Sequence, residues 1–268
     1  MTENNKYVSV PMAFRLTLKQ FLAHQEVLSL LALLYSLILL IFSWPVVSGD
    51  LPLLPTFVEG DEIPAVWPYL LIFLGTFIFG AIYQSCLARI LNLGPGGLIL
   101  RNKAQMVSDA IKTIGFMIQG LVFMAVWVVP IFIMFSMIAT GNENPVLPIL
   151  TLIFIFIALF AGFAITQALY VSVAAIGRGK HLPLRKAWES LEGNKLKFGL
   201  YIVIVFLGLY IVNGVLVNIF IFLGLMESMA RFSSAFNFVV YSFLTSLSTF
   251  LFMGMADLIA RKETNGIT

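Results

Sequence analysis

Five strongly polar side chains lie inside otherwise apolar stretches of this sequence, at Gln84, Gln119, Gln167, Asn213 and Asn218. Amide groups inside a membrane-spanning stretch could line a hydrophilic path or a substrate site. Alternatively, they could bridge neighbouring helices, each interhelical hydrogen bond being worth about 0.6 to 2 kcal/mol. Both interpretations stay open from the sequence. No carboxylate or cation accompanies these amides in mid-stretch, so the sequence offers little for an ion-coupled transporter.

A dense group of basic residues surrounds one short amphipathic segment. Within it, Leu184, Ala187, Trp188 and Leu191 recur at helical spacing, which predicts a short helix. Lys and Arg near a membrane surface attract anionic headgroups by about 1 kcal/mol per charge. Alternatively, these charges only fix the orientation of the chain in the membrane. The candidate residues for contact with lipid or a partner protein are Arg178, Lys180, Arg185, Lys186, Trp188, Lys195 and Lys197.

The sequence contains no pattern typical of a catalytic or metal centre. Its two histidines, His24 and His181, lie in or beside predicted surface helices, and the single cysteine, Cys86, has no second thiol to pair with. The motifs of zinc proteases, serine hydrolases and phosphate-binding loops are missing. We therefore expect no catalytic residue, metal or cofactor. A nucleic-acid partner is not expected, because the Lys and Arg residues lie in short loops beside apolar segments.

One acidic residue lies near the end of the last apolar stretch. Asp257 precedes Arg261 by four residues, the spacing of an ion pair on one helix face. A carboxylate in this position could act as a gate or a coupling acid. The spacing favours the alternative, in which Asp257 pairs with Arg261 at the membrane surface.

The composition indicates a membrane protein. Of 268 residues, 60% are hydrophobic and only 11% are charged, whereas about a quarter of the residues of a soluble domain are charged. The longest stretch without a span-length apolar run is the N-terminal 26 residues. Residues 1–268 are therefore expected to form a single integral membrane domain.

Apolar periodicity predicts an all-α fold, a polytopic membrane helical bundle with six transmembrane helices. An amphipathic helix at about 11–22 precedes them, because Phe14, Leu18, Phe21 and Leu22 recur on one face; it is expected to lie at the membrane surface. A weakly amphipathic piece starting near Gln105 precedes the third span. The spans are predicted at about 26–47, 66–91, 114–138, 150–176, 198–223 and 238–260.

The positions of the charges predict the orientation. Six spans place 15 of the 16 Lys and Arg residues on one side of the membrane, and only Arg231 on the other. Because loops rich in Lys and Arg stay in the cytoplasm, both termini are expected there, and the amphipathic helices lie on the cytoplasmic face.

The ends of the second and fourth spans resemble each other. Ala81–Gly96 reads AIYQSCLARILNLGPG and Ala164–Gly179 reads AITQALYVSVAAIGRG, with alanine, isoleucine, glutamine and two glycines at one common offset. An amphipathic segment and another span follow each of them. The pattern indicates a possible internal repeat of three hairpins, each preceded by an amphipathic segment starting near Pro11, Gln105 or Pro183.

The stretch GRGKHLPLRKAWESLEGNKLKFGLY, from Gly177 to Tyr201, resembles a pattern found in bacterial six-span membrane families. In these families a glycine-bounded basic loop, an amphipathic helix and Gly-Asn precede a span. They include the membrane domain attached to some glycerophosphodiester phosphodiesterases, whose soluble domain this sequence lacks. The resemblance implies the six-span fold and an inner-membrane location, and it brings over no catalytic residue.

Taken together, these features predict a non-enzymatic integral inner-membrane protein. It would act through contact with anionic lipid headgroups, or as an accessory or scaffold subunit of a membrane complex. The alternative is a transporter or channel for a small or amphiphilic substrate, lined by Gln84, Gln167 and Asn213.

Overall fold

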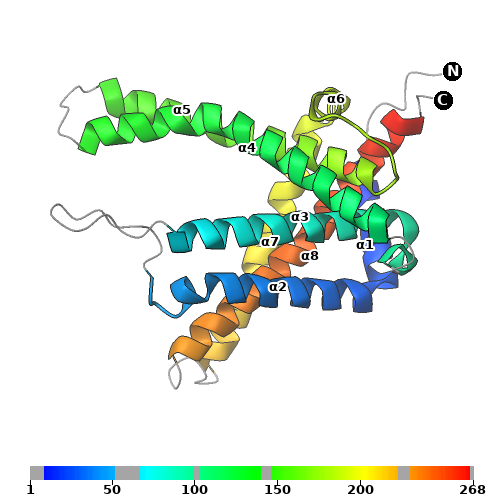
Figure 1. Ribbon diagram of the computed structural model, residues 1–268, viewed down its shortest axis with the longest axis horizontal. Coiled ribbons are helices and arrows are strands. Elements are labelled where there is room, and N and C mark those ends of the chain that lie inside the picture. Colours follow the sequence, from blue (N-terminus) through cyan, green and yellow to red (C-terminus); the bar gives the residue numbers. More distant parts are fainter. Residues whose placement is uncertain (1–8, 52–66, 99–102, 140–145, 223–229, 266–268) are drawn as a thin grey trace.

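The computed structural model describes residues 9–51, 67–98, 103–139, 146–222 and 230–265, and every regular element in these ranges is helical. Six helices are long and apolar enough to cross a membrane, so the chain is an all-α, multi-pass membrane protein (Figure 1). The elements are α1 (Val10–Ala23), α2 (Gln25–Val47), α3 (Trp67–Leu93), the 3-10 helix η2 (Pro95–Leu98), α4 (Lys103–Ala139), α5 (Val146–Ile176), α6 (Leu184–Ser190), α7 (Lys195–Phe222) and α8 (Ala230–Asn265).

The weakly amphipathic piece predicted to lead into the third span is the first part of the same helix. Helix α4 runs without a break from Lys103 to Ala139. The sequence between the amphipathic piece and the span contains no proline or left-handed glycine to stop the helix. In contrast, α1 and α2 are separated at His24, whose φ is −129°, and Gly193, with a φ of +79°, lies between α6 and α7. Two separate amphipathic helices therefore remain.

The spanning helices form three hairpins, α2 with α3, α4 with α5, and α7 with α8. The returning helices α3, α5 and α8 all contact one another and form the centre of the bundle. The described ends of the chain lie at the same end of the molecule (Figure 1). The sequence repeat pairs Gly94 with Gly177 and Gly96 with Gly179. Of these four glycines, the two with left-handed backbone are Gly94 (φ +67°) and Gly179 (φ +69°), which the repeat does not pair with each other. The duplication itself stays a prediction.

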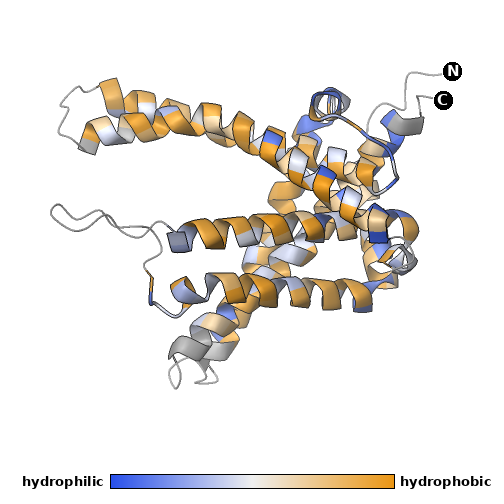
Figure 2. Ribbon diagram, viewed as in Figure 1, coloured by the Kyte–Doolittle hydropathy of each residue, from blue (hydrophilic) through white to orange (hydrophobic). Residues whose placement is uncertain are grey.

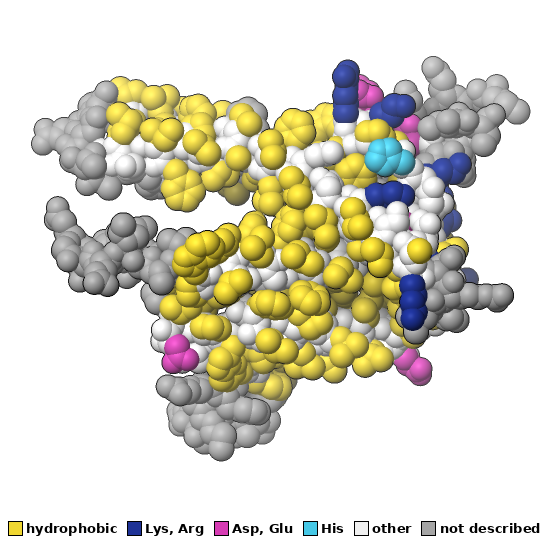
Figure 3. Space-filling view, in the orientation of Figure 1, with side chains coloured by type: hydrophobic (Ala, Val, Ile, Leu, Met, Phe, Trp, Pro, Cys, Tyr) yellow, Lys and Arg dark blue, Asp and Glu magenta, His cyan; other side chains and the backbone are white. Residues whose placement is uncertain are grey.

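The Lys and Arg side chains of the visible face gather at the end of the bundle where the termini lie (Figure 3), which we call the basic end. Between the two ends the helices are covered with apolar residues (Figure 2). Helix α8 starts at the opposite end, and Arg231 belongs to its first turn. Lys6 and Arg101 lie outside the described residues.

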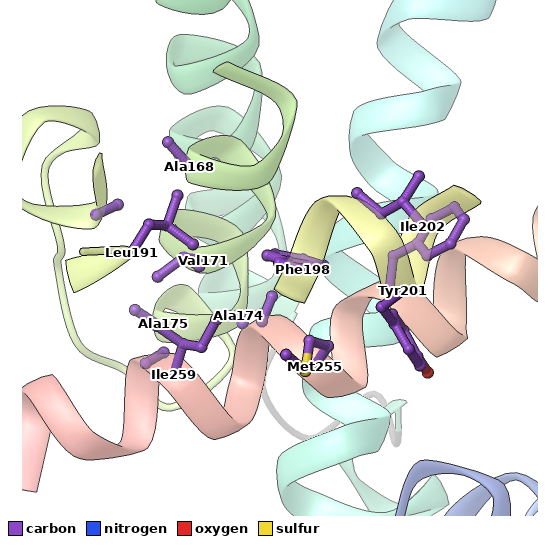
Figure 4. Close-up of a cluster of buried hydrophobic side chains, with 14 of the residues drawn as sticks. Ala168, Val171, Ala174, Ala175, Leu191, Phe198, Tyr201, Ile202, Met255 and Ile259 are labelled. Carbon is purple, nitrogen blue, oxygen red and sulfur yellow. The ribbon is translucent and has the colours of Figure 1, made fainter. Parts of the chain in front are cut away.

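The buried core lies in the half of the bundle next to the basic end. Buried residues of α5 are concentrated between 165 and 176, and those of α3 between 80 and 91. In Figure 4, small side chains of α5 such as Ala174 and Ala175 meet Phe198 of α7 and Met255 of α8. Toward the opposite end the hairpin of α4 and α5 diverges from that of α2 and α3 (Figure 1).

Helix α1 lies at the basic end and packs against α8 (Figure 1). Its buried residues are Ala13 and Thr17, and Thr17 packs against Gly254 of α8 so closely that a Cβ at Gly254 would overlap it. Phe14 and Leu18, from the predicted apolar face, remain exposed. Small residues thus bring α1 close to α8, and the ring of Phe21 adds a contact with Phe250 at 6.2 Å between ring centres.

A close backbone contact between α5 and α3 yields a first prediction. A methyl group on Gly177, just after α5, would overlap the backbone carbonyl of Ala88 on α3, which cannot rotate away. The substitution Gly177→Ala is expected to lower the free energy of unfolding by about 1 to 3 kcal/mol, the usual cost of overpacking. Denaturant titration of the purified protein in mild detergent measures it.

Gly208→Ala is the matched control, because a Cβ at Gly208 of α7 has nothing within 4 Å. This variant is expected to be no less stable than the unsubstituted protein, because alanine is more favourable in a helix than glycine. Equal stability of the two variants would contradict the close contact between α3 and α5.

Candidate functional site

Residues 177–197, which run from the end of α5 into the first turn of α7 and which we call the elbow, are docked on the core. Gly179 adopts a φ of +69° and turns the chain away from α5. Leu184, Ala187 and Leu191 are buried in the cluster formed by α5, α7 and α8. The predicted apolar spacing of α6 is confirmed for these three residues, and they pack on protein instead of lipid.

The exposed face of the elbow presents four cations and one tryptophan, namely Lys180, Arg185, Lys186, Lys195 and Trp188. The ammonium nitrogen of Lys195 lies 4.5 Å from the centre of the Trp188 ring, a cation–π contact. Arg185 pairs with Glu189 at 3.1 Å, but the two side chains are 91% and 58% exposed, so this pair adds little stability. Lys180 and Lys186 form no ion pair with any described residue and can therefore contact an external anion.

Arg178 does not belong to the exposed cations of the elbow, because its side chain is mostly buried. Its Nε donates to Oδ1 of Asp257 at 2.8 Å, and Nε of Arg261 donates to Oδ2 of the same carboxylate at 2.8 Å. The Asp257 side chain is only 3% exposed. The predicted pair of Asp257 with Arg261 is therefore confirmed, and Arg178 is a second partner. Lys197, the last of the predicted contact residues, is half-buried.

A second buried ion pair joins α3 to α4. Nη1 of Arg89 donates to Oδ2 of Asp109 at 2.6 Å, and Nε of Arg89 donates to the carbonyl of Gly97 at 3.0 Å. Gln105 donates to the other carboxylate oxygen of Asp109 at 2.8 Å. Sequence reasoning missed this network, because it counted Arg89 as an ordinary interfacial charge. The available signal was an acid twenty residues after the arginine, across one short connector.

Of the five amides within the spans, Gln167 bridges two helices. It is 4% exposed on α5. In the amide orientation that its surroundings require, its nitrogen donates to the carbonyl of Lys195 and its oxygen accepts from the backbone N–H of Gly199. Gly199 has no side chain to block this approach. Gln167 therefore fastens α5 to the first turn of α7.

The other four amides are distributed over three helices, α3, α4 and α7. Gln119 on α4 is exposed. Asn218 on α7 is also exposed, and its amide nitrogen donates to the carbonyl of Gly214 in its own helix. Gln84 on α3 and Asn213 on α7 are half-buried. The Oδ1 atom of Asn213 is buried and has no hydrogen-bond partner among the described residues.

A cavity of about 470 Å³ opens between the hairpin of α4 and α5 and that of α7 and α8. Its lining is almost entirely apolar and contains none of the five amides. The predicted polar residues and the cavity are thus separate features of the bundle.

The histidines and the cysteine lie apart from one another. His181 stacks on Phe116 of α4 with ring centres 5.5 Å apart. His24 lies at the junction of α1 and α2, and Cys86 is buried in α3. Within the ranges that the structure describes, no three His, Cys, Asp or Glu side chains come close enough to hold a metal ion.

Comparisons of the chain with protein-family models, curated proteins and solved structures gave no match. The resemblance of Gly177–Tyr201 to bacterial six-span families therefore stays a prediction. The functional argument rests on the geometry of the basic end and of the cavity.

The Asp257 network yields a second prediction. Asp257→Asn leaves Arg178 and Arg261 close together without a neutralising carboxylate. Removing one partner of a buried ion pair costs about 3 to 5 kcal/mol, so a loss of this size is expected in the free energy of unfolding in detergent. Arg261→Gln is expected to cost less, because the Arg261 side chain is 43% exposed.

Glu189→Gln provides the control, since it breaks an exposed pair on the same elbow. It is expected to change stability by less than about 1 kcal/mol. If Asp257→Asn cost no more than Glu189→Gln, the structural role assigned to the buried carboxylate would be wrong.

Proposed function

We propose that this chain is a non-enzymatic integral protein of the bacterial inner membrane that acts by contacting anionic lipid headgroups through its elbow. Both termini lie in the cytoplasm in this proposal, because loops rich in Lys and Arg stay on that side. The elbow then meets the inner leaflet, whose surface is negatively charged.

The observation that carries the proposal is the fixed exposure of four cations beside a tryptophan. Leu184, Ala187 and Leu191 hold the elbow on the core, so its backbone is already ordered before a headgroup binds. Tryptophan favours the headgroup level of a bilayer, and Trp188 is exposed in contact with Lys195. This combination suits a lipid surface better than an acidic patch on a partner membrane complex, for which the tryptophan would have no special use.

The alternative, a transporter or channel, receives weaker support. A hydrophilic substrate would need polar groups along its path, and the cavity lining includes none of the amides predicted for that role. Only a substrate with a large apolar part would suit this cavity. We therefore favour contact with lipid over transport.

A third prediction tests the elbow. In bilayers of phosphatidylethanolamine and phosphatidylglycerol, the protein is expected to enrich phosphatidylglycerol around itself. Combined substitution of Lys180, Arg185, Lys186 and Lys195 by glutamine should remove that enrichment. Near the membrane surface, each cation contributes about 1 kcal/mol to the attraction of an anionic headgroup. Losing one cation is therefore expected to lower the preference for phosphatidylglycerol by up to about fivefold. Lipid mass spectrometry of the purified protein with its retained lipids measures the ratio.

The matched control replaces the same number of exposed cations elsewhere at the basic end, with glutamine at Arg15, Lys19, Lys103 and Lys112. It should leave most of the enrichment in place. A protease-accessible C-terminal tag verifies that both variants insert in the same orientation. The proposal fails if the elbow variant keeps the full preference, or if both variants lose it equally.

A further inference from the structure

The cavity between the two hairpins is built for an apolar ligand. Thr166 is one of its few polar lining residues, and its hydroxyl donates to the carbonyl of Gly162 in the same helix at 2.8 Å. The ring of Tyr170, the other polar lining residue, packs against the buried core cluster. The hydroxyl of Thr166 is thus engaged within its own helix and is not directed at a ligand. What the cavity offers to a ligand is the surface of aliphatic and aromatic side chains such as Leu159 and Phe206.

The size and shape of the cavity suit one chain of a lipid. Its volume of about 470 Å³ lies within the range of about 300 to 1,000 Å³ that is common for small-molecule pockets. Along α5 the lining extends from Ile155 to Tyr170, about 22 Å at 1.5 Å per residue. Half of the hydrocarbon layer of a bilayer is about 15 Å thick. The lining is therefore longer than the hydrocarbon depth of one leaflet, and an acyl chain of that leaflet can contact it along the full length of the chain.

The cavity lies below the exposed cations of the elbow. Lys195, Ile202 and Phe206 share one face of α7, at positions i, i+7 and i+11, and the last two line the cavity. Ile202 is therefore about 10 Å and Phe206 about 16 Å deeper along the helix than Lys195. The headgroup layer is about 5 to 8 Å thick. When Lys195 and Trp188 lie at headgroup level, the cavity begins at the depth of the acyl chains.

We propose that the cavity between α5 and α7 holds one acyl chain of a phospholipid from the inner leaflet, whose anionic headgroup contacts Lys195 and the neighbouring cations of the elbow. This inference rests on the proposed function and adds a defined position for one lipid molecule. The apolar lining of the cavity favours an acyl chain, and the cations of the elbow, which lie closer to the membrane surface, favour an anionic headgroup. A bound lipid would also fill space that the diverging hairpins leave open between α5 and α7.

Filling the cavity tests the inference. The substitutions Thr166→Phe and Leu159→Trp each place a larger side chain in the cavity from different turns of α5. The protein is transferred from bilayers of phosphatidylethanolamine and phosphatidylglycerol into mild detergent, and native mass spectrometry counts the phospholipids retained by each chain. The unsubstituted protein is expected to retain one phospholipid, and both variants are expected to lose it.

Ile157→Phe is the matched control. Ile157 lies on the side of α5 opposite to the lining, is 39% exposed and does not line the cavity, so this variant should keep its lipid. The thermal unfolding midpoint verifies that every variant is folded. The inference is overturned if both filling variants retain the lipid, or if the molecule found in the unsubstituted protein is an unrelated small molecule or a second copy of the chain.

The elbow variant separates this inference from the proposed function. With its four cations replaced by glutamine, the protein should still retain one phospholipid through the apolar cavity, but without a preference for phosphatidylglycerol. Loss of that preference together with lipid retention in both filling variants would support the elbow and refute the cavity. A preference that persists in the elbow variant, together with lipid loss in the filling variants, would refute headgroup selection and leave the acyl-chain site standing.

Discussion

Lipid chains are as apolar as leucine, so helices in a bilayer gain little by burying large aliphatic side chains against each other. They associate where small residues allow close approach and where polar groups can pair. In this protein both conditions are met at the basic end. Gly177 lies against the backbone of Ala88, and Thr17 lies against Gly254. Asp257 joins α5 to α8 within the same half of the bundle, so this half holds the fold together.

The divergence of the hairpins follows from the same constraint. Beyond the basic half, α4 and α5 carry large exposed side chains such as Val126, Phe132, Phe156 and Phe160, which contact lipid as favourably as they would contact another helix. Nothing there compels the three hairpins to close, and the hairpin of α4 and α5 leans away from the others (Figure 1). The apolar cavity lies at the border between the closely packed half and the open half.

Features that depend on local sequence could be predicted, and those that depend on pairing in space could not. The apolar runs and the glycines gave the six spans and the elbow, and the four-residue spacing predicted the pair of Asp257 with Arg261. The sequence predicted an amphipathic piece leading into the third span, and the fold shows that the two form one helix from Lys103 to Ala139. The burial of Arg89 and Arg178 was missed because counting charges treats all arginines alike, whereas only the fold brings Asp109 and Asp257 to them.

The basic residues therefore fall into two groups with different roles. Arg89 and Arg178 neutralise buried carboxylates and keep helices together. Lys180 and Lys195 belong to the exposed group and leave their charge at the surface. Gly179 separates the groups within three residues of chain, since its φ of +69° directs Arg178 toward the core side and Lys180 away from it. The left-handed turn thus divides one run of positive charge into a structural part and a part that remains available to a ligand.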